Sequence, residues 1–157
     1  MKKLKIYIDT SVIGGCFDSE FETDLLQLIE RIKTGQFILL LSDVVLSELK
    51  NAPAKVQTIL TSIPTAYIEQ IELTAEIFEL QQAYLDAAIL TEKWADDALH
   101  VACATVARAD ALISWNFKHI VRLDKMKAYN QINLLNGYGI LTILVPKGVL
   151  TDESTDN

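Results

Sequence analysis

The chain has 157 residues, about the length of one ordinary domain, and carries 21 acidic against 14 basic residues, for a net charge of −7. Half of its residues are hydrophobic and 22% are charged, which excludes a disordered chain, and no apolar run approaches the about 18 residues that cross a bilayer. The acidic balance also argues against a protein that binds nucleic acid through an overall positive field.

The N-terminus and the cysteines indicate where such a domain works. The start MKKLKIYIDTS is basic, but its apolar piece is too short for a signal peptide and is interrupted by Asp9. Cys16 and Cys103 show no CxxC spacing, which fits small core residues in a reducing compartment better than a disulfide or a zinc site. We therefore expect a soluble, cytoplasmic protein with no membrane partner.

The first half of the chain is typical of a strand, a helix and a second strand, followed by two shorter helices. Short apolar runs predict the strands, and an apolar stripe closed by Gly35 predicts the first helix. Prolines 53 and 64 limit the last two helices, and Ser42 or Asp43 caps the first of these. The expected ranges are strands at 4–8 and 37–41 and helices at 22–33, 43–51 and 54–60.

The second half continues the alternation. Residues 67–73 are either a strand or an extended linker; the other expected ranges are helices at 74–90, 96–108 and 124–136 and strands at 111–115 and 140–145. Strands that alternate with helices predict an α/β fold, a central mainly parallel sheet covered by helices on both faces. We expect one domain over residues 1–146 and a disordered, acidic tail over residues 147–157.

Four polar side chains follow the expected strands or open the next helix. Asp9 ends the first strand, Glu48 lies on the helix after the second strand, Asp97 opens an alanine-rich helix, and Asn116 follows the strand after it. In parallel sheets the residues beyond the carboxyl ends of the strands face one cleft. Each has a plainer interpretation, because Asp9 and Asp97 fit helix caps, Glu48 a surface acid and Asn116 a turn residue.

A cluster of carboxylates needs a cation to offset its mutual repulsion. Hard divalent ions such as Mg2+ or Mn2+ bind oxygen ligands and suit this set, whereas two histidines and two cysteines are too few and too scattered for zinc. Such ions lower the pKa of a bound water and stabilise charge on a phosphoryl group. The pattern therefore favours metal-dependent cleavage of a phosphodiester.

Three stretches carry a resemblance to a known family: YIDTSVIGG, LLLSDVVLSEL and ADDALHVACATVARADALISWNFKHI, in this order and spacing. Together they resemble the PIN domain, the family that includes the VapC-like toxins of bacterial toxin–antitoxin systems. The resemblance covers residues 5–146. It implies a three-layer α/β/α sandwich and a Mg2+- or Mn2+-dependent endoribonuclease, the toxin of a type II toxin–antitoxin pair.

The resemblance also assigns roles to residues. The family acids fall on Asp9, Glu48 and Asp97, of which Asp9 and Asp97 bind the metal, and the fourth acidic position falls on Asn116. The supporting residues are Thr10 and Ser11, whose hydroxyls lie near the metal, and Asp96, which is a helix N-cap or a weaker second acid. A site with three carboxylates and one amide is expected to hold metal less tightly than one with four.

Basic and aromatic residues surround the last of these stretches. Lys118 and Arg122 are candidates to hold substrate phosphate, against the alternative of a solvated helical face. We expect Trp94, Trp115 and Phe117 to be packing residues, although an exposed Trp115 or Phe117 would be able to stack on a base. His100 fits a structural role, and His119 has no assigned role.

Two further classes of function remain open. The missing fourth acid and the negative net charge fit a catalytically weakened PIN-like domain that binds RNA or a protein. A metal-dependent phosphatase or DNA nuclease is a weaker alternative, because the metal chemistry does not choose the polyanion. The resemblance implies the partners: an RNA substrate, an antitoxin protein and a second copy of the chain in a homodimer.

Overall fold

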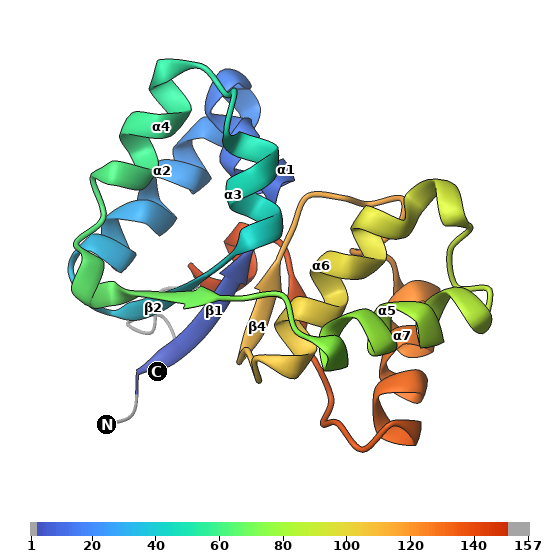
Figure 1. Ribbon diagram of the computed structural model, residues 1–157. Coiled ribbons are helices and arrows are strands. Elements are labelled where there is room, and N and C mark those ends of the chain that lie inside the picture. Colours follow the sequence, from blue (N-terminus) through green and yellow to red (C-terminus); the bar gives the residue numbers. More distant parts are fainter. Residues whose placement is uncertain (1–2, 151–157) are drawn as a thin grey trace, which may run out of the picture.

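A parallel sheet forms the centre of the molecule. The computed structural model describes residues 3–150, apart from the side chains of Cys16 and Phe17. Within that range the sheet has five strands in the order β3-β2-β1-β4-β5, and every pair of neighbours is parallel (Figure 1). The strands are β1 (Leu4–Ile8), β2 (Phe37–Ser42), β3 (Ile68–Ile71), β4 (Ala111–Ile113) and β5 (Ile143–Leu144). The predicted α/β class with a parallel sheet is confirmed.

Helices cover both faces of this sheet. The α-helices are α1 (Thr10–Ile13), α2 (Ser19–Lys33), α3 (Asp43–Leu49), α4 (Ala54–Thr61), α5 (Ala75–Asp86), α6 (Ala95–Val106), α7 (Leu123–Leu135) and α8 (Pro146–Val149). Short 3-10 turns are η1 (Gly14–Phe17), η2 (Thr65–Tyr67) and η3 (Glu92–Trp94). Helices α2 and α4 lie on one side, and α5, α6 and α7 lie on the other (Figure 1). No helix within residues 3–150 is both long and apolar enough to cross a membrane.

Most expected elements are confirmed, and two of the helices have different ends for local reasons. Helix α2 begins three residues early because the Asp18 side chain accepts a hydrogen bond from the Glu20 N–H and caps it. Helix α5 ends at Asp86 rather than at residue 90, since Ala88 adopts the left-handed conformation with φ 59°. Residues 67–73 do contain a strand, β3, which pairs with β2.

The two strands expected at 111–115 and 140–145 are much shorter in the structure. β4 ends at Ile113 and β5 covers Ile143–Leu144 alone. The last hydrogen bond from this strand to β5 is the one that the Ser114 N–H donates to Leu144 O. The N–H of Asn116, two residues on, would continue the pairing, but it donates to the Ser114 hydroxyl at 2.9 Å instead. Asn116 therefore lies in a loop, three residues beyond Ile113, the last paired residue of β4, and not at the strand end that the apolar run suggested.

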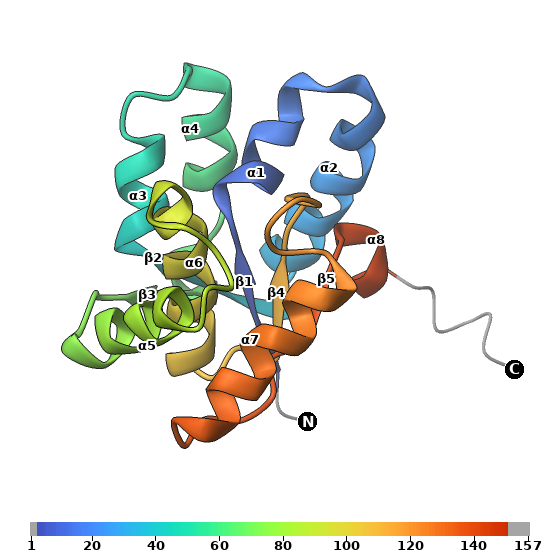
Figure 2. The same cartoon turned by 90° about the vertical axis from the view of Figure 1, so that its right-hand side faces the viewer.

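The C-terminal boundary also differs from the expectation at residue 146. Residues 146–149 form α8, which lies at the edge of the sheet beside β5 (Figure 2) and packs against α2. The Arg31 guanidinium of α2 donates to the carbonyls of Val149 and Leu150, at 3.4 and 3.2 Å. The sequence predicts a disordered tail from residue 147, whereas the structure places residues 147–150 in α8 and its C-cap, in contact with that guanidinium. Residues 151–157 lie outside the described residues.

The order of the strands sets the position of a site. The chain moves from β1 to β2 and β3 on one side and then returns to β4 on the other side of β1. In such sheets ligands bind beyond the carboxyl ends of the strands at the point where the order reverses. That point lies between β1 and β4, where Ile8 pairs with Ile113. Asp9 and Ser114 are the next residues of the two strands.

Candidate active site

Asp9 lies at the reversal point and is buried, with 3% of its surface exposed. Its Oδ1 accepts a hydrogen bond from the Ser11 hydroxyl and its Oδ2 accepts one from the Ser114 hydroxyl, both at 2.5 Å. Each hydroxyl accepts in turn from a backbone N–H, Ser11 from Trp115 at 3.1 Å and Ser114 from Asn116 at 2.9 Å. Each backbone N–H takes one lone pair of its hydroxyl and leaves the hydroxyl proton to point at Asp9.

The surroundings of Asp9 leave a negative charge incompletely offset. Burial raises the pKa of this carboxyl above its ordinary value, and the hydrogen bonds from Ser11 and Ser114 act against that rise without cancelling it. Two hydroxyl donors also use one lone pair on each oxygen and leave others for a further ligand. A buried carboxylate with free lone pairs is a suitable place for a cation.

Glu48 projects from α3 and is held by His100 of α6. The Nε2 of His100 lies 2.7 Å from Glu48 Oε1, and its Nδ1 lies 2.8 Å from the Tyr7 hydroxyl, which is 2.6 Å from the Ser42 hydroxyl. Burial raises the pKa of Tyr7 well above its usual range, so Tyr7 remains a phenol. If Tyr7 donates to Nδ1, then Nε2 carries a proton and donates to Glu48. One hydrogen-bond chain thus leads from the end of β2 to Glu48.

Two further effects act on Glu48. Burial acts to raise its pKa, but the hydrogen bond from His100, together with the positive charge of that ring in its protonated form, outweighs this and lowers the pKa below its ordinary value. The Thr10 hydroxyl adds to the lowering. Thr10 Oγ1 is itself buried and makes no hydrogen bond with good geometry. An unsatisfied buried oxygen beside a carboxylate indicates room for a polar ligand.

Asp97 lies in the first turn of α6 and is held by the second histidine. His119 Nδ1 lies 2.8 Å from Asp97 Oδ2. The His119 ring packs against Trp94 at a tilt of 43°, with 4.4 Å between ring centroids, and the backbone carbonyl of His119 accepts from the buried Tyr129 hydroxyl at 2.9 Å. His119 is thus fixed at its ring and at its backbone, and it holds Asp97 in one orientation.

Asn116 shapes the loop that carries His119. Its side-chain oxygen accepts from the His119 N–H at 3.0 Å, and its backbone oxygen accepts from Ile120 and Val121 at 3.1 and 2.8 Å. An amide oxygen that accepts from the N–H three residues on is the contact of an N-cap. In the structure the side chain beside Asp9 is that of Ser114, and Asn116 makes the contacts of a turn residue.

The matched pair Asn116→Asp and Asn116→Ala tests this capping contact. Aspartate caps as well as asparagine, whereas alanine leaves the His119 N–H without its partner, so we expect the alanine variant alone to lose about 1 kcal/mol of unfolding free energy. Urea unfolding in EDTA measures this. If both variants lose the same amount, the capping contact is not what stabilises the loop.

The sequence profile of the PIN domain matches residues 5–118, which include Asp9, Glu48, Asp97 and Asn116. The chain belongs to the PIN domain family. No curated protein matches the chain significantly.

Two solved structures resemble this PIN domain. FitAcB from Neisseria gonorrhoeae is 12% identical with a TM-score of 0.54, over 90% of this chain and 98% of that chain. VapBC2 from Rickettsia felis, bound to a DNA fragment from its promoter, is 14% identical with a TM-score of 0.49, over 89% and 97% of the two chains. At this identity the likeness to FitAcB supports the fold.

The remaining predicted site residues of the PIN domain are Asp96, Arg122 and Lys118, and their surroundings differ. Asp96 is exposed in the first turn of α6, and its expected capping role is wrong because Trp94 occupies the N-cap position. Arg122 is bound to Asp124, with Nε 2.7 Å from Oδ1 and Nη2 2.9 Å from Oδ2. This pair offsets the charge of Arg122. The Lys118 ammonium lies 5.1 Å from the centre of the Trp94 ring.

The carboxylates do not form a ready-made metal site. Within residues 3–150 no three His, Cys, Asp or Glu side chains are arranged to hold a metal ion. The donor chemistry nevertheless fits a hard cation, because the three acids and the unsatisfied Thr10 hydroxyl supply oxygen ligands. Each histidine occupies one oxygen of its carboxylate, Glu48 or Asp97, so the second oxygen of each remains for a cation.

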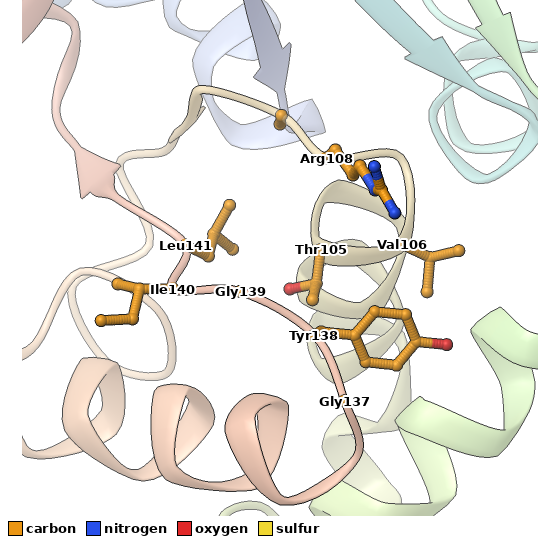
Figure 3. A pocket seen from close by; sticks show the side chains of 9 residues that line it. Thr105, Val106, Arg108, Gly137, Tyr138, Gly139, Ile140 and Leu141 are labelled. Carbon is orange, nitrogen blue, oxygen red and sulfur yellow. The ribbon is translucent and has the colours of Figure 1, made fainter.

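A pocket elsewhere on the PIN domain is not part of this site. Its volume is about 490 Å3, and it lies between the end of α6 and the loop at residues 137–141, with Thr105, Arg108 and Tyr138 among its lining (Figure 3). These segments come just before β4 and β5. The pocket therefore lies at the amino end of the parallel strands, opposite Asp9.

Sequence reasoning missed the groups that hold the three acids. The sequence predicts a strand through Ser114 and gives no indication of a role for His119. His100 has one available signal, since it lies three residues after Asp97 on the same helix and so shares a face with it. The contact between His119 and Asp97 spans 22 residues and two elements, and no local pattern indicates it.

Proposed function

We propose that this PIN domain is an endoribonuclease that depends on Mg2+ or Mn2+, with Asp9, Glu48 and Asp97 as its catalytic acids. The observation that carries the proposal is the buried Asp9 carboxylate at the reversal point of a parallel sheet, with a raised pKa and spare lone pairs. A cation there offsets the cost of the buried charge. Membership of the PIN family adds support, because PIN domains are generally nucleases that use divalent metals.

The bound metal would activate a water and stabilise charge on the phosphoryl group. Asp9 and Asp97 would hold it, with Glu48 as the third acid and Asn116 as a weaker neighbour. The chain's own contribution is orientation: Ser11 and Ser114 fix Asp9. Lys118 would hold a substrate phosphate, and Arg122 would do so only where the phosphate displaces Asp124.

The histidines act on the other two acids. His100 presents Glu48, and His119 presents Asp97, each through one carboxylate oxygen. Groups that orient metal-binding carboxylates in this way typically affect metal affinity or activity by about 10–100-fold when removed. We infer that both histidines are positioning residues of this site.

The biological setting that fits this enzyme is a toxin–antitoxin pair. We infer a cytoplasmic homodimer that a small antitoxin protein holds inactive. The family, which includes VapC-like toxins, is the support for this setting. An open reading frame for a small protein adjacent to that of this chain, whose product co-purifies with it, would support the pairing; its absence would leave a nuclease without a cognate inhibitor.

A cleavage assay with neighbouring acids tests the enzyme directly. Labelled structured and unstructured RNAs are incubated with Mn2+, Mg2+ or EDTA and the wild-type, Asp97→Asn or Asp96→Asn protein. We expect metal-dependent cleavage that falls at least about 100-fold in Asp97→Asn, because a ligand is lost, and changes less than about threefold in Asp96→Asn, whose side chain is exposed. Equal effects of the two substitutions would contradict the assignment of Asp97.

A catalytically weakened domain that binds RNA or a protein is the second candidate. The observation that favours it is that both Glu48 and Asp97 are engaged by histidines, and that no three side chains of the described part are arranged to hold a metal. Retained RNA binding without cleavage in either metal would support this candidate over the enzyme.

A further inference from the structure

We propose that four residues beside the carboxylates, Lys93, Trp94, Phe117 and Lys118, form a binding surface for single-stranded RNA. We call them the Trp94 surface. On this surface the two lysines hold phosphates and Phe117 stacks on a base. The inference rests on the proposed function for the location of the cleaved bond, and it adds the form of RNA that the site accepts and the residues that select it.

The two lysines come from distant segments and meet at one ring. Lys93 lies in η3 and Lys118 in the loop after β4, and each ammonium lies 5.1 Å from the centre of the Trp94 ring. Neither makes an ion pair with another residue in the part of the chain that the structure describes, whereas Arg122 is paired with Asp124. Two uncompensated cations on a chain of net charge −7 mark a local place for a polyanion.

The Trp94 surface is one side chain away from Asp97. The Trp94 ring packs against His119 with 4.4 Å between ring centroids, and His119 Nδ1 lies 2.8 Å from Asp97 Oδ2. A strand whose phosphates contact Lys93 and Lys118 would therefore run past Asp97.

Of the two aromatic residues in the loop after β4, one is packed and the other is exposed. Trp115 packs on Phe21, with ring centroids 4.4 Å apart, and lies against Gly15. Phe117 is 54% exposed, next to Lys118 in the sequence. An exposed aromatic ring on the loop that also carries a lysine is able to stack on a base while the backbone follows the charges. In a duplex the faces of the bases are covered by their neighbours, so the Trp94 surface favours a single strand.

The salt dependence of RNA binding tests the lysines without any catalysis. Wild-type protein in EDTA is titrated with a fluorescently labelled uridine dodecamer at several salt concentrations, alongside Lys93→Ala/Lys118→Ala and the control Lys33→Ala. Each phosphate contact on a single strand contributes about 0.7 to the slope of log K against log salt, so the double variant should lose about 1.4. Lys33 ends α2, just before β2, at the opposite end of the sheet, and its variant should keep the slope.

A second comparison tests Phe117. Phe117→Ala should bind the uridine dodecamer about 5- to 100-fold more weakly and bind an abasic dodecamer as the wild type does, because stacking needs a base. Phe117→Tyr should restore binding. Phe78→Ala removes an aromatic residue with 47% exposure on α5 and should have no effect.

The outcomes separate this inference from the proposed function. An unchanged salt slope in the double variant, or equal losses on the uridine and abasic strands, overturns the Trp94 surface even where metal-dependent cleavage is observed. Binding of a duplex as tight as that of the single strand also overturns it. The predicted slope and stacking effects without cleavage uphold the surface and overturn only the nuclease.

Discussion

Asp9→Asn should abolish metal-dependent RNA cleavage and, in EDTA, make the protein more stable. The substitution keeps the shape of the side chain and removes its charge. Only 3% of the surface of Asp9 is exposed, so the charge is removed from a buried site. The Ser11 and Ser114 hydroxyls rotate to suit an amide. At neutral pH we expect a gain of about 1 kcal/mol, or about 3 °C in Tm for a chain of this length, and a loss of cleavage of at least about 100-fold.

The pH dependence of this gain follows from the raised pKa of Asp9. Because the pKa is higher in the folded than in the unfolded state, the wild-type carboxyl contributes stability below its ordinary pKa of 3.8 and loses it as pH rises through the folded pKa. The Asn variant has no such loss. The stability difference should therefore be smallest in acid, grow as pH rises through the folded pKa of Asp9, and then level off.

Mg2+ or Mn2+ supplies the control for this prediction. A cation that binds the folded wild type raises its Tm, whereas Asp9→Asn lacks the ligand and should show no such rise. Thermal unfolding of both proteins in EDTA and with each metal measures this. An Asn variant that is less stable than the wild type in EDTA at neutral pH would show that the Asp9 charge stabilises the fold, contrary to our interpretation.

Gly15→Ala should damage the loop that carries Ser114 and Asn116. A Cβ at Gly15 would lie 2.2 Å from Trp115 Cζ3, and the Trp115 ring has little freedom because it packs on Phe21. Overpacking of this kind costs about 1–3 kcal/mol of unfolding free energy. The displaced ring would also pull the Trp115 N–H from Ser11, and cleavage should fall with the stability.

Gly14→Ala is the matched control for this substitution. A Cβ at Gly14 has no atom within 4 Å, and its backbone, with φ −64° and ψ −17°, suits alanine. We expect unchanged stability or a gain of about 0.4–1 kcal/mol from the restricted unfolded chain. Urea unfolding and a cleavage assay of both variants decide the matter. Equal behaviour of the two would mean that the Trp115 ring does not fix the loop.

The fold, and the positions that the three acids take in it, could be predicted from the sequence because local signals encode them. The apolar run 4–8 and the polar Asp9 after it define a buried strand and its end, and Gly35, with φ 83°, closes α2 as its position indicated. The order of strands and helices then sets the parallel sheet. All of these depend on residues close together in the chain.

The contacts that hold the three acids could not be predicted, because they join residues that are far apart in the chain. The apolar run 111–115 extends past the last pairing of β4, because the length of that strand is set by the short partner β5, 30 residues away. The contacts of His100 with Tyr7 and of His119 with Asp97 join separate elements. The family pattern predicts that Asn116 takes the place of an acid. Its capping contact with the His119 N–H depends instead on the loop after β4, which begins where the sequence still predicts a strand.

The most direct test of the central claim, that the three acids bind a divalent metal, is an anomalous difference map from a crystal soaked in Mn2+. We predict a Mn2+ peak within about 2.5 Å of an Asp9 carboxylate oxygen, with Asp97 as a second ligand. A crystal that takes up Mn2+ elsewhere, or none, while the pairs Glu48–His100 and Asp97–His119 stay as they are here, would contradict it.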